Sequence, residues 1–178
     1  MVRTSLSNPI EVAWTEVTTP GRLGLTFAPG KKARSAFGSP WDRDLELDLA
    51  ALRAAGVDVL GCLLEDHELT TLKIPALFDR AAAHGLSVLR LPIEDGGVPA
   101  LEGAQALVAE VVGLLEAGRS VVYHCRGGLG RAGTLTACTR IQLGDNPSAA
   151  MAEVRRVRPG AIENSRQEAF VHAYRTQR

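Results

Sequence analysis

The residue types that can do chemistry gather around position 125. Cys125 follows His124, and Arg131 comes six residues after the cysteine, beyond a glycine-rich stretch. Glycine lets a loop turn its backbone N–H groups toward a bound anion, and such a loop at the start of a helix binds phosphate. The same N–H dipoles stabilise a cysteine thiolate, and the planar guanidinium of an arginine can hold two oxygens of a tetrahedral anion. The pattern predicts thiolate attack on a phosphate ester. The predicted phosphate-binding loop consists of Arg126, Gly127, Gly128, Leu129, Gly130 and Arg131.

A second interpretation of the same glycines is a dinucleotide-binding fingerprint. Gly128, Gly130 and Gly133 match the GxGxxG pattern, and Glu153 follows at a suitable distance. That fingerprint requires a further strand that ends at the acidic residue, whereas the chain after Arg131 has helical patterning. The triphosphate-binding pattern GxxxxGK[ST] is absent from the sequence. These observations favour the thiolate interpretation.

The loop must lie between a strand and a helix, and the hydrophobic pattern supplies both. Residues 120–123 are an apolar run, and the chain from position 131 onward has helical patterning. Upstream, strand-like and helical segments alternate, which predicts an α/β fold with a mostly parallel sheet of four to five strands flanked by helices. The other expected strands are 12–18, 23–27, 57–64 and 86–91. The other expected helices are one through Leu45, Leu49 and Leu52, one at 75–83 and one at 101–117.

Turn and capping residues place the element boundaries. Glycine and proline in residues 28–41 and 92–99 predict two loops. Two later helix starts are also expected, because a side-chain oxygen there can cap the first turn. They are Asn146 before Pro147, and a capping box of Ser165 and Glu168.

The composition limits the function classes. The chain has 178 residues, 46% hydrophobic and 22% charged, which is typical of one globular domain spanning 1–178. Twenty basic and twenty acidic residues give zero net charge, so no basic field attracts nucleic acid. No apolar run is long enough to cross a membrane. Three dispersed cysteines without a CxxC pair indicate a cytoplasmic protein with neither a disulfide framework nor a zinc site.

The sequence also resembles a known family. The string from His124 to Arg131 looks like the signature of the cysteine-dependent protein tyrosine and dual-specificity phosphatases, and is most similar to the kinase-associated phosphatase branch. Residues 92–99 are similar to the general-acid loop of that branch, and weaker matches extend the resemblance over about residues 20–175. The resemblance implies a dual-specificity phosphatase-like fold and hydrolysis of phosphotyrosine or phosphoserine and phosphothreonine in proteins. It also implies a cysteinyl-phosphate intermediate and no metal or cofactor.

The resemblance assigns further roles. Asp95 matches the general acid, and a carboxylic acid on a glycine-containing loop at the sheet edge can protonate a leaving oxygen. Glu94 is the neighbouring alternative. Gln167 resembles the glutamine that positions the hydrolytic water in related enzymes. His124 is expected to orient the loop and favour the thiolate.

One departure from the family concerns the residue after the signature arginine. Most relatives carry Ser or Thr there, with a hydroxyl that donates to the cysteine sulfur, whereas this chain has Ala132. Thr134 lies on a different helix face and is not expected to substitute. Two alternatives therefore stay open beside an active protein phosphatase. One is a weakly active pseudophosphatase or phosphate-binding module, and the other is an enzyme of the same fold that acts on a phosphoinositide.

Cys62 is a candidate redox partner of Cys125. It lies near the C-terminal end of its expected strand, at the sheet edge where the site is expected. Related phosphoinositide phosphatases hold a cysteine at a similar position that traps the oxidised nucleophile. The resemblance thus implies a reversible Cys62–Cys125 disulfide, and the alternative is an ordinary core cysteine.

Overall fold

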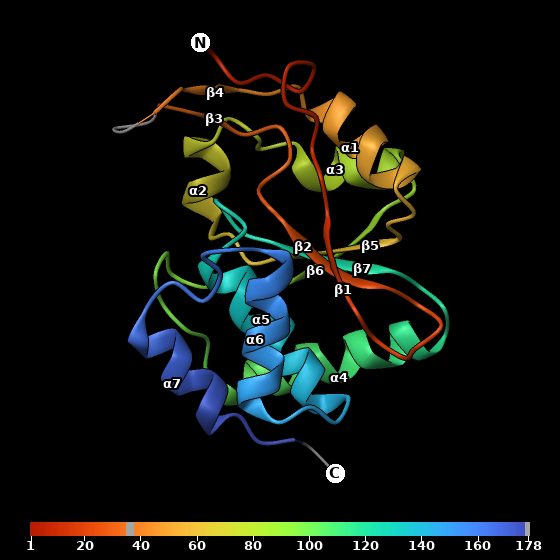
Figure 1. The fold of residues 1–178 in the computed structure, drawn as a ribbon. Coiled ribbons are helices and arrows are strands. Elements are labelled where there is room, and N and C mark those ends of the chain that lie inside the picture. The colour runs from red at the N-terminus through yellow and green to blue at the C-terminus, as the bar shows by residue number, and fades with distance from the viewer. Residues whose placement is uncertain (35–37, 177–178) are drawn as a thin grey trace.

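The fold is a sheet with a layer of helices on each face (Figure 1). A computed structural model describes residues 1–34 and 38–176. Its strands are β1 Ala13–Thr15, β2 Leu23–Thr26, β3 Lys32–Ala33, β4 Trp41–Asp42, β5 Val59–Cys62, β6 Ser87–Arg90 and β7 Val121–His124. Its helices are α1 Leu45–Ala54, α2 Asp66–Thr71, α3 Leu77–Ala83, α4 Leu101–Glu116, α5 Gly130–Gln142, α6 Pro147–Val157 and α7 Ser165–Ala173. In the described part of the chain, no helix has the length and apolar character that a membrane crossing requires.

The main sheet has five strands in the order β1-β2-β7-β5-β6. Only β1 runs antiparallel to its neighbour, which confirms the predicted α/β fold with a mostly parallel sheet. His124 pairs in register with Thr26 on one side and with Cys62 on the other. The carboxyl ends of these strands therefore meet at one edge, which is where ligands bind in parallel sheets.

The core consists of two clusters, one on each face of the sheet. Leu60, Cys62 and Val122 point toward α1, α2 and α3. Val121 and Tyr123 point toward the layer of α4 to α7 (Figure 1). Because the central strands are buried on both faces, their sequences are continuous apolar runs rather than alternating ones.

Two elements differ from the sequence prediction. The expected loop 28–41 contains a short antiparallel pair, β3 with β4, which two residues per strand are too few to reveal in sequence. Residues 35–37 of that loop lie outside the described residues. The second element is α2, a six-residue polar helix with no apolar period, which begins with a capping box of Glu65 and Glu68.

The helix starts near the C-terminus differ in how well they were predicted. Asn146 caps α6 as expected, and its side chain accepts from the N–H of Ala149 at 2.9 Å. The expected capping box at Ser165 is wrong, because Asn164 caps α7 instead. Its side chain accepts from the Gln167 N–H at 2.9 Å, which makes Ser165 the first helical residue. Asn ranks with Ser as a cap, so adjacent candidates are hard to separate from sequence.

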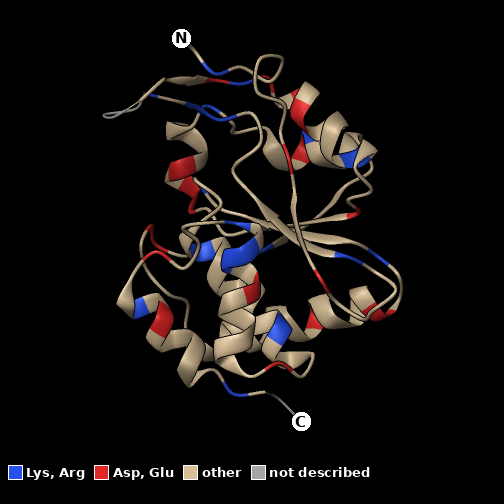
Figure 2. Ribbon diagram, viewed as in Figure 1, with Lys and Arg blue, Asp and Glu red and all other residues tan. Residues whose placement is uncertain are grey.

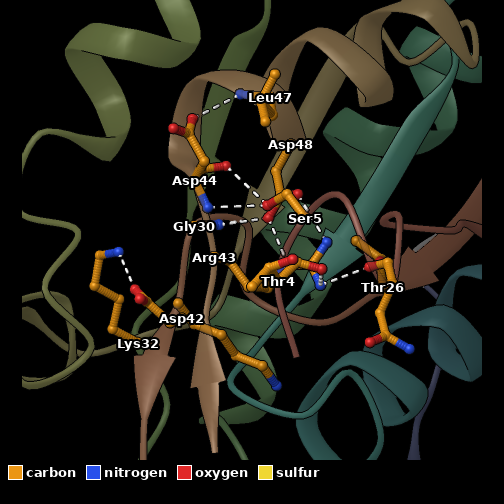
Figure 3. Close-up of polar contacts among 12 residues, drawn as sticks. Thr4, Ser5, Thr26, Gly30, Lys32, Asp42, Arg43, Asp44, Leu47 and Asp48 are labelled. Atoms are coloured by element: carbon orange, nitrogen blue, oxygen red, sulfur yellow. Dashed lines mark hydrogen bonds and ion pairs between the residues drawn. The ribbon is translucent and has the colours of Figure 1, made fainter. Parts of the chain in front are cut away.

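A buried ion pair between Arg43 and Asp48 fixes the chain segment before β3 (Figure 3). Arg43 Nε and Nη2 donate to the two Asp48 oxygens at 2.7 and 2.8 Å. Asp48 also accepts from the Gly30 N–H at 2.8 Å, and Arg43 Nη1 donates to the Asn8 carbonyl at 2.7 Å. The pair therefore joins the N-terminal segment, α1 and the backbone that carries Lys31.

We expect Asp48→Asn to destabilise the fold strongly. The substitution leaves the Arg43 guanidinium buried without a countercharge, which costs about 3–5 kcal/mol of unfolding free energy. Urea denaturation followed by circular dichroism measures this loss. The matched control is Asp42→Asn, which removes an exposed ion pair with Lys32 and is expected to leave the urea midpoint unchanged. A loss no larger than that of the control contradicts the prediction.

Candidate active site

The predicted phosphate-binding loop connects β7 to α5, and two of its glycines lie in close contact with other parts of the chain. Gly128 has φ of +69°, and a Cβ there would collide with the Thr26 backbone at the end of β2. A Cβ on Gly130 would collide with the side chains of Glu163 and Gln167. Glycine at these positions lets the loop pack directly against β2 and the start of α7.

Donors from other parts of the chain bind the carbonyl groups of this loop. The Arg126 carbonyl accepts from Lys31 Nζ at 3.1 Å. The Gly127 and Gly128 carbonyls accept from Arg158 at 2.9 and 3.2 Å. Across a trans peptide the C=O and the next N–H point in opposite directions. The following N–H groups are therefore directed away from these donors, where an anion can accept from them.

The predicted nucleophile and general acid lie in one cavity of about 280 Å³. Cys125 lines it together with the loop residues Arg126, Gly127 and Leu129, and Asp95 lines it from the expected acid loop. Glu94 is not among the lining residues, which favours Asp95 of the two carboxyl candidates. The other lining residues are Lys31, Ala33, Arg34, Trp41 and Glu163.

Arg131 is almost fully buried and holds several segments together. Its side chain is 1% exposed and binds both Glu68 oxygens, at 2.7 and 2.9 Å. It also donates to the Ile93 carbonyl at 2.8 Å and to Asp95 at 3.1 Å. The arginine therefore links the phosphate-binding loop to α2 and to the acid loop, and both terminal nitrogens of its guanidinium are hydrogen-bonded to these segments rather than exposed in the cavity.

Sequence reasoning missed Glu68, which is the main partner of Arg131. Burial works to raise the pKa of Glu68, but hydrogen bonds from Arg131 and from the Glu65 N–H hold it below its usual value. A charged Glu68 thus balances the charge of the buried arginine. The capping pattern of Glu65 and Glu68 was the one signal in the sequence that could have drawn attention to this helix.

The acid loop is attached to the start of α7. Asn164 Nδ2 donates to the Gly96 carbonyl at 3.0 Å, and Gln167 Nε2 donates to the Gly97 carbonyl at 3.3 Å. Gln167 is fully buried, and its Oε1 accepts from the Glu163 N–H at 2.8 Å. The structure therefore brings Gln167 between the acid loop and the phosphate-binding loop.

His124 is buried and uncharged at neutral pH. Its Nδ1 lies 3.5 Å from the Cys125 carbonyl oxygen, and burial lowers the pKa of its imidazole to about 4. Among the described residues its Nε2 has no hydrogen-bond partner. A neutral imidazole brings no positive charge to the Cys125 sulfur.

The other two cysteines are buried thiols. Burial raises the pKa of Cys62 to about 11 and also raises the pKa of Cys138 well above its usual value. Cys62 packs in the cluster against α1, α2 and α3, whereas Cys125 belongs to the cluster on the other face. The Cys62–Cys125 disulfide stays a prediction.

The hydroxyl groups near position 132 are already engaged. Thr134 Oγ1 donates to the Gly130 carbonyl, and Thr136 Oγ1 donates to the Ala132 carbonyl, each at 2.7 Å. This agrees with the expectation that Thr134 does not replace the missing hydroxyl at position 132.

Basic side chains border the loop although the whole chain is neutral. Figure 2 shows basic segments where α5 begins and along β3. The described residues contain no group of three or more His, Cys, Asp or Glu arranged to hold a metal ion. The site as described offers backbone N–H groups and basic side chains as the binding partners of an anion.

The chain matches known phosphatases in sequence. The family model "Polymorphic toxin system, DSP-PTPase phosphatase" matches residues 37–145. Cyclin-dependent kinase inhibitor 3 of Rattus norvegicus is 30% identical over 173 residues, which cover 94% of this chain and 79% of that protein. Protein tyrosine phosphatase type IVA 2 of Mus musculus is 34% identical over 122 residues, which cover 63% of this chain and 70% of that protein.

Solved structures agree with these sequence matches. The crystal structure of kinase associated phosphatase, with its catalytic-site cysteine substituted by serine, has a TM-score of 0.84 to this chain. The identity is 27%, and the superposition covers 93% of each chain. Fold, signature and sequence similarity thus lead to one conclusion: the chain belongs to the DSP-PTPase family of cysteine-dependent protein tyrosine and dual-specificity phosphatases.

Proposed function

We propose that Cys125, Arg131 and Asp95 hydrolyse phosphomonoesters on phosphorylated proteins through a cysteinyl-phosphate. The observation that carries this proposal is the shared cavity, in which Cys125 and Asp95 meet beside the phosphate-binding loop. A nucleophile, an anion site and a proton donor are the three groups that the reaction requires.

In the first step, the Cys125 thiolate attacks phosphorus in line with the leaving oxygen. The S–P bond forms and the P–O bond breaks while the loop N–H groups hold the other oxygens. The incoming phosphate replaces the exposed Asp95 carboxyl on Arg131, whereas buried Glu68 keeps its two bonds to the guanidinium. Asp95, released from the arginine, takes up a proton from water and gives it to the leaving oxygen.

In the second step, a water molecule attacks the phosphorus of the cysteinyl-phosphate. Asp95 takes the proton of this water, the S–P bond breaks and the electron pair returns to the Cys125 sulfur. Gln167 is proposed to position the water, because its amide lies beside Gly130 of the phosphate-binding loop and donates to the Gly97 carbonyl of the acid loop. His124 keeps the proposed role of orienting the loop.

Phosphorylated proteins are the proposed substrates because one relative is named a protein tyrosine phosphatase and another a cyclin-dependent kinase inhibitor. A panel of phosphotyrosine and phosphothreonine peptides and phosphoinositides tests this choice, with Cys125→Ser as the inactive control. Faster hydrolysis of the phosphoinositides would favour the lipid alternative. No hydrolysis even of p-nitrophenyl phosphate would favour the pseudophosphatase. Single-domain organisation, cytoplasmic location and the absence of nucleic-acid binding stay predictions.

We expect iodoacetate to alkylate Cys125 first. The two other thiols are buried and have raised pKa values, so both stay protonated at neutral pH. Inorganic phosphate or vanadate should protect the reactive thiol, because either anion occupies the loop. Mass spectrometry of peptides identifies the labelled residue. Prior labelling of Cys62 or Cys138 would contradict the assignment of the nucleophile.

We expect Asp95→Asn to lower turnover in proportion to the need for leaving-group protonation. An alkyl phosphate should lose about 10²–10⁴-fold in kcat, whereas p-nitrophenyl phosphate should lose much less, because its leaving group is a stable anion. Glu94→Gln is the matched control and should affect both substrates little. Equal losses for the two substrates would show that Asp95 has a structural role.

A further inference from the structure

Lys31 is a buried cation at the active site that the proposed mechanism does not use. The chain has only three lysines, and Lys31 is 6% exposed. Its ammonium lies 4.7 Å from the Phe27 ring centroid and 4.4 Å from that of Trp41. It also lines the cavity that contains Cys125. These rings leave one side of the ammonium for the phosphate-binding loop.

The ammonium forms a hydrogen bond to the first peptide of that loop. Lys31 Nζ donates to the carbonyl of Arg126, the residue bonded to Cys125. A positive charge on this carbonyl polarises the peptide and strengthens the Gly127 N–H as a donor. The backbone position of Lys31 is itself fixed, because Asp48 holds the preceding residue, Gly30 (Figure 3).

The charge of Lys31 has no carboxylate counterpart. Among the described residues no Asp or Glu forms an ion pair with it, although a buried charge is ordinarily paired. The charged groups that act on it most strongly are three arginines and Cys125, of which only Cys125 can be an anion. The Cys125 thiolate, or a phosphate bound in the cavity, adds a negative charge that compensates this cation.

We propose that Lys31 is a positioning residue whose ammonium stabilises the Cys125 thiolate. It thereby replaces the stabilisation that a hydroxyl at position 132 gives the sulfur in most relatives and that Ala132 cannot give. In the second step the S–P bond breaks and the electron pair goes to sulfur, so a nearby positive charge lowers the barrier. This inference rests on the proposed role of Cys125 as the nucleophile.

The pH dependence follows from the surroundings of Lys31. Burial lowers its pKa to about 8, the charges of Arg43, Arg126 and Arg158 act in the same direction, and the Cys125 thiolate opposes them. As the pH rises through about 8, Lys31 loses its charge and the thiolate loses its partner. The carboxyl groups on the same cavity are Asp95 and Glu163. Turnover should therefore fall above about pH 8, and this fall should be absent in Lys31→Met.

The first test measures the reactivity of Cys125 without turnover. Iodoacetamide is uncharged, so its rate of alkylation against pH reports the thiolate and not anion binding. Lys31→Met keeps an unbranched side chain, one atom shorter, and removes the charge. It should move the midpoint of the profile up by about one pH unit, which slows alkylation about tenfold at pH values well below both midpoints. Lys31→Arg should restore the midpoint, and the exposed neighbour Lys32→Met should not change it.

The second test uses the missing hydroxyl. With p-nitrophenyl phosphate, Lys31→Met should enlarge the initial burst of p-nitrophenol and lower the steady-state turnover rate about tenfold. The reason is that the phosphoenzyme then breaks down slowly. Adding Ala132→Ser should recover most of this loss, since the new hydroxyl donates to the same sulfur. Ala132→Ser alone should raise the turnover rate of the otherwise wild-type protein much less.

An unchanged alkylation midpoint in Lys31→Met would overturn the inference, and so would an equal shift in Lys32→Met. Thermal melting distinguishes the proposed role from a purely structural one. In a purely structural role, Lys31→Met would lower the melting temperature and leave the alkylation midpoint unchanged. Absence of hydrolysis in the wild type would overturn the proposed function. The alkylation profile would still decide the role of Lys31, because it requires no turnover.

Discussion

The bidentate ion pair between Arg131 and Glu68 is the interaction on which the site depends. It joins the first turn of α5 to α2, and the same guanidinium binds the acid loop through Ile93 and Asp95. Removing one member of a buried pair leaves an uncompensated charge, so each member fixes the other. One side chain therefore contacts both the segment of the proposed nucleophile and that of the proposed proton donor. In the proposed mechanism, the bond to the exposed Asp95 is the one that an entering phosphate replaces.

Much of the site could be predicted from the sequence because local chemistry determines it. Glycines between a cysteine and an arginine at this spacing are typical of a loop that binds an anion, and the strand before them is a clear apolar run. Cys125 and Asp95 share a cavity as the sequence indicated. The alternation of elements predicted a mostly parallel sheet of four to five strands, and the structure has five.

The missed residues are those whose role depends on distant contacts. Glu68 lies on a short polar helix with no hydrophobic period, and its partner is 63 positions away. Lys31 lies in a segment that looks like an ordinary loop, and only the packed Phe27 and Trp41 rings make it a buried cation. Neither burial nor a long-range ion pair leaves a local pattern in the sequence.

Net charge was equally uninformative about the site. The chain is neutral overall, yet basic groups bind three successive carbonyls of the loop. These cations come from Lys31 and Arg158, which lie near opposite ends of the chain. The positive potential of the site is thus a property of the folded molecule, and it disappears when the chain unfolds.

This wide separation has a consequence for dissecting the protein into fragments. The segment that matches the family model, residues 37–145, contains the signature and the acid loop. It lacks the side chains that donate to the carbonyls of the phosphate-binding loop, because Lys31 precedes it and Arg158 follows it. The capping Asn164, which holds the acid loop, also lies outside it. A minimal catalytic unit cut to the signature region would keep every reacting atom and lose the scaffold that gives those atoms their geometry.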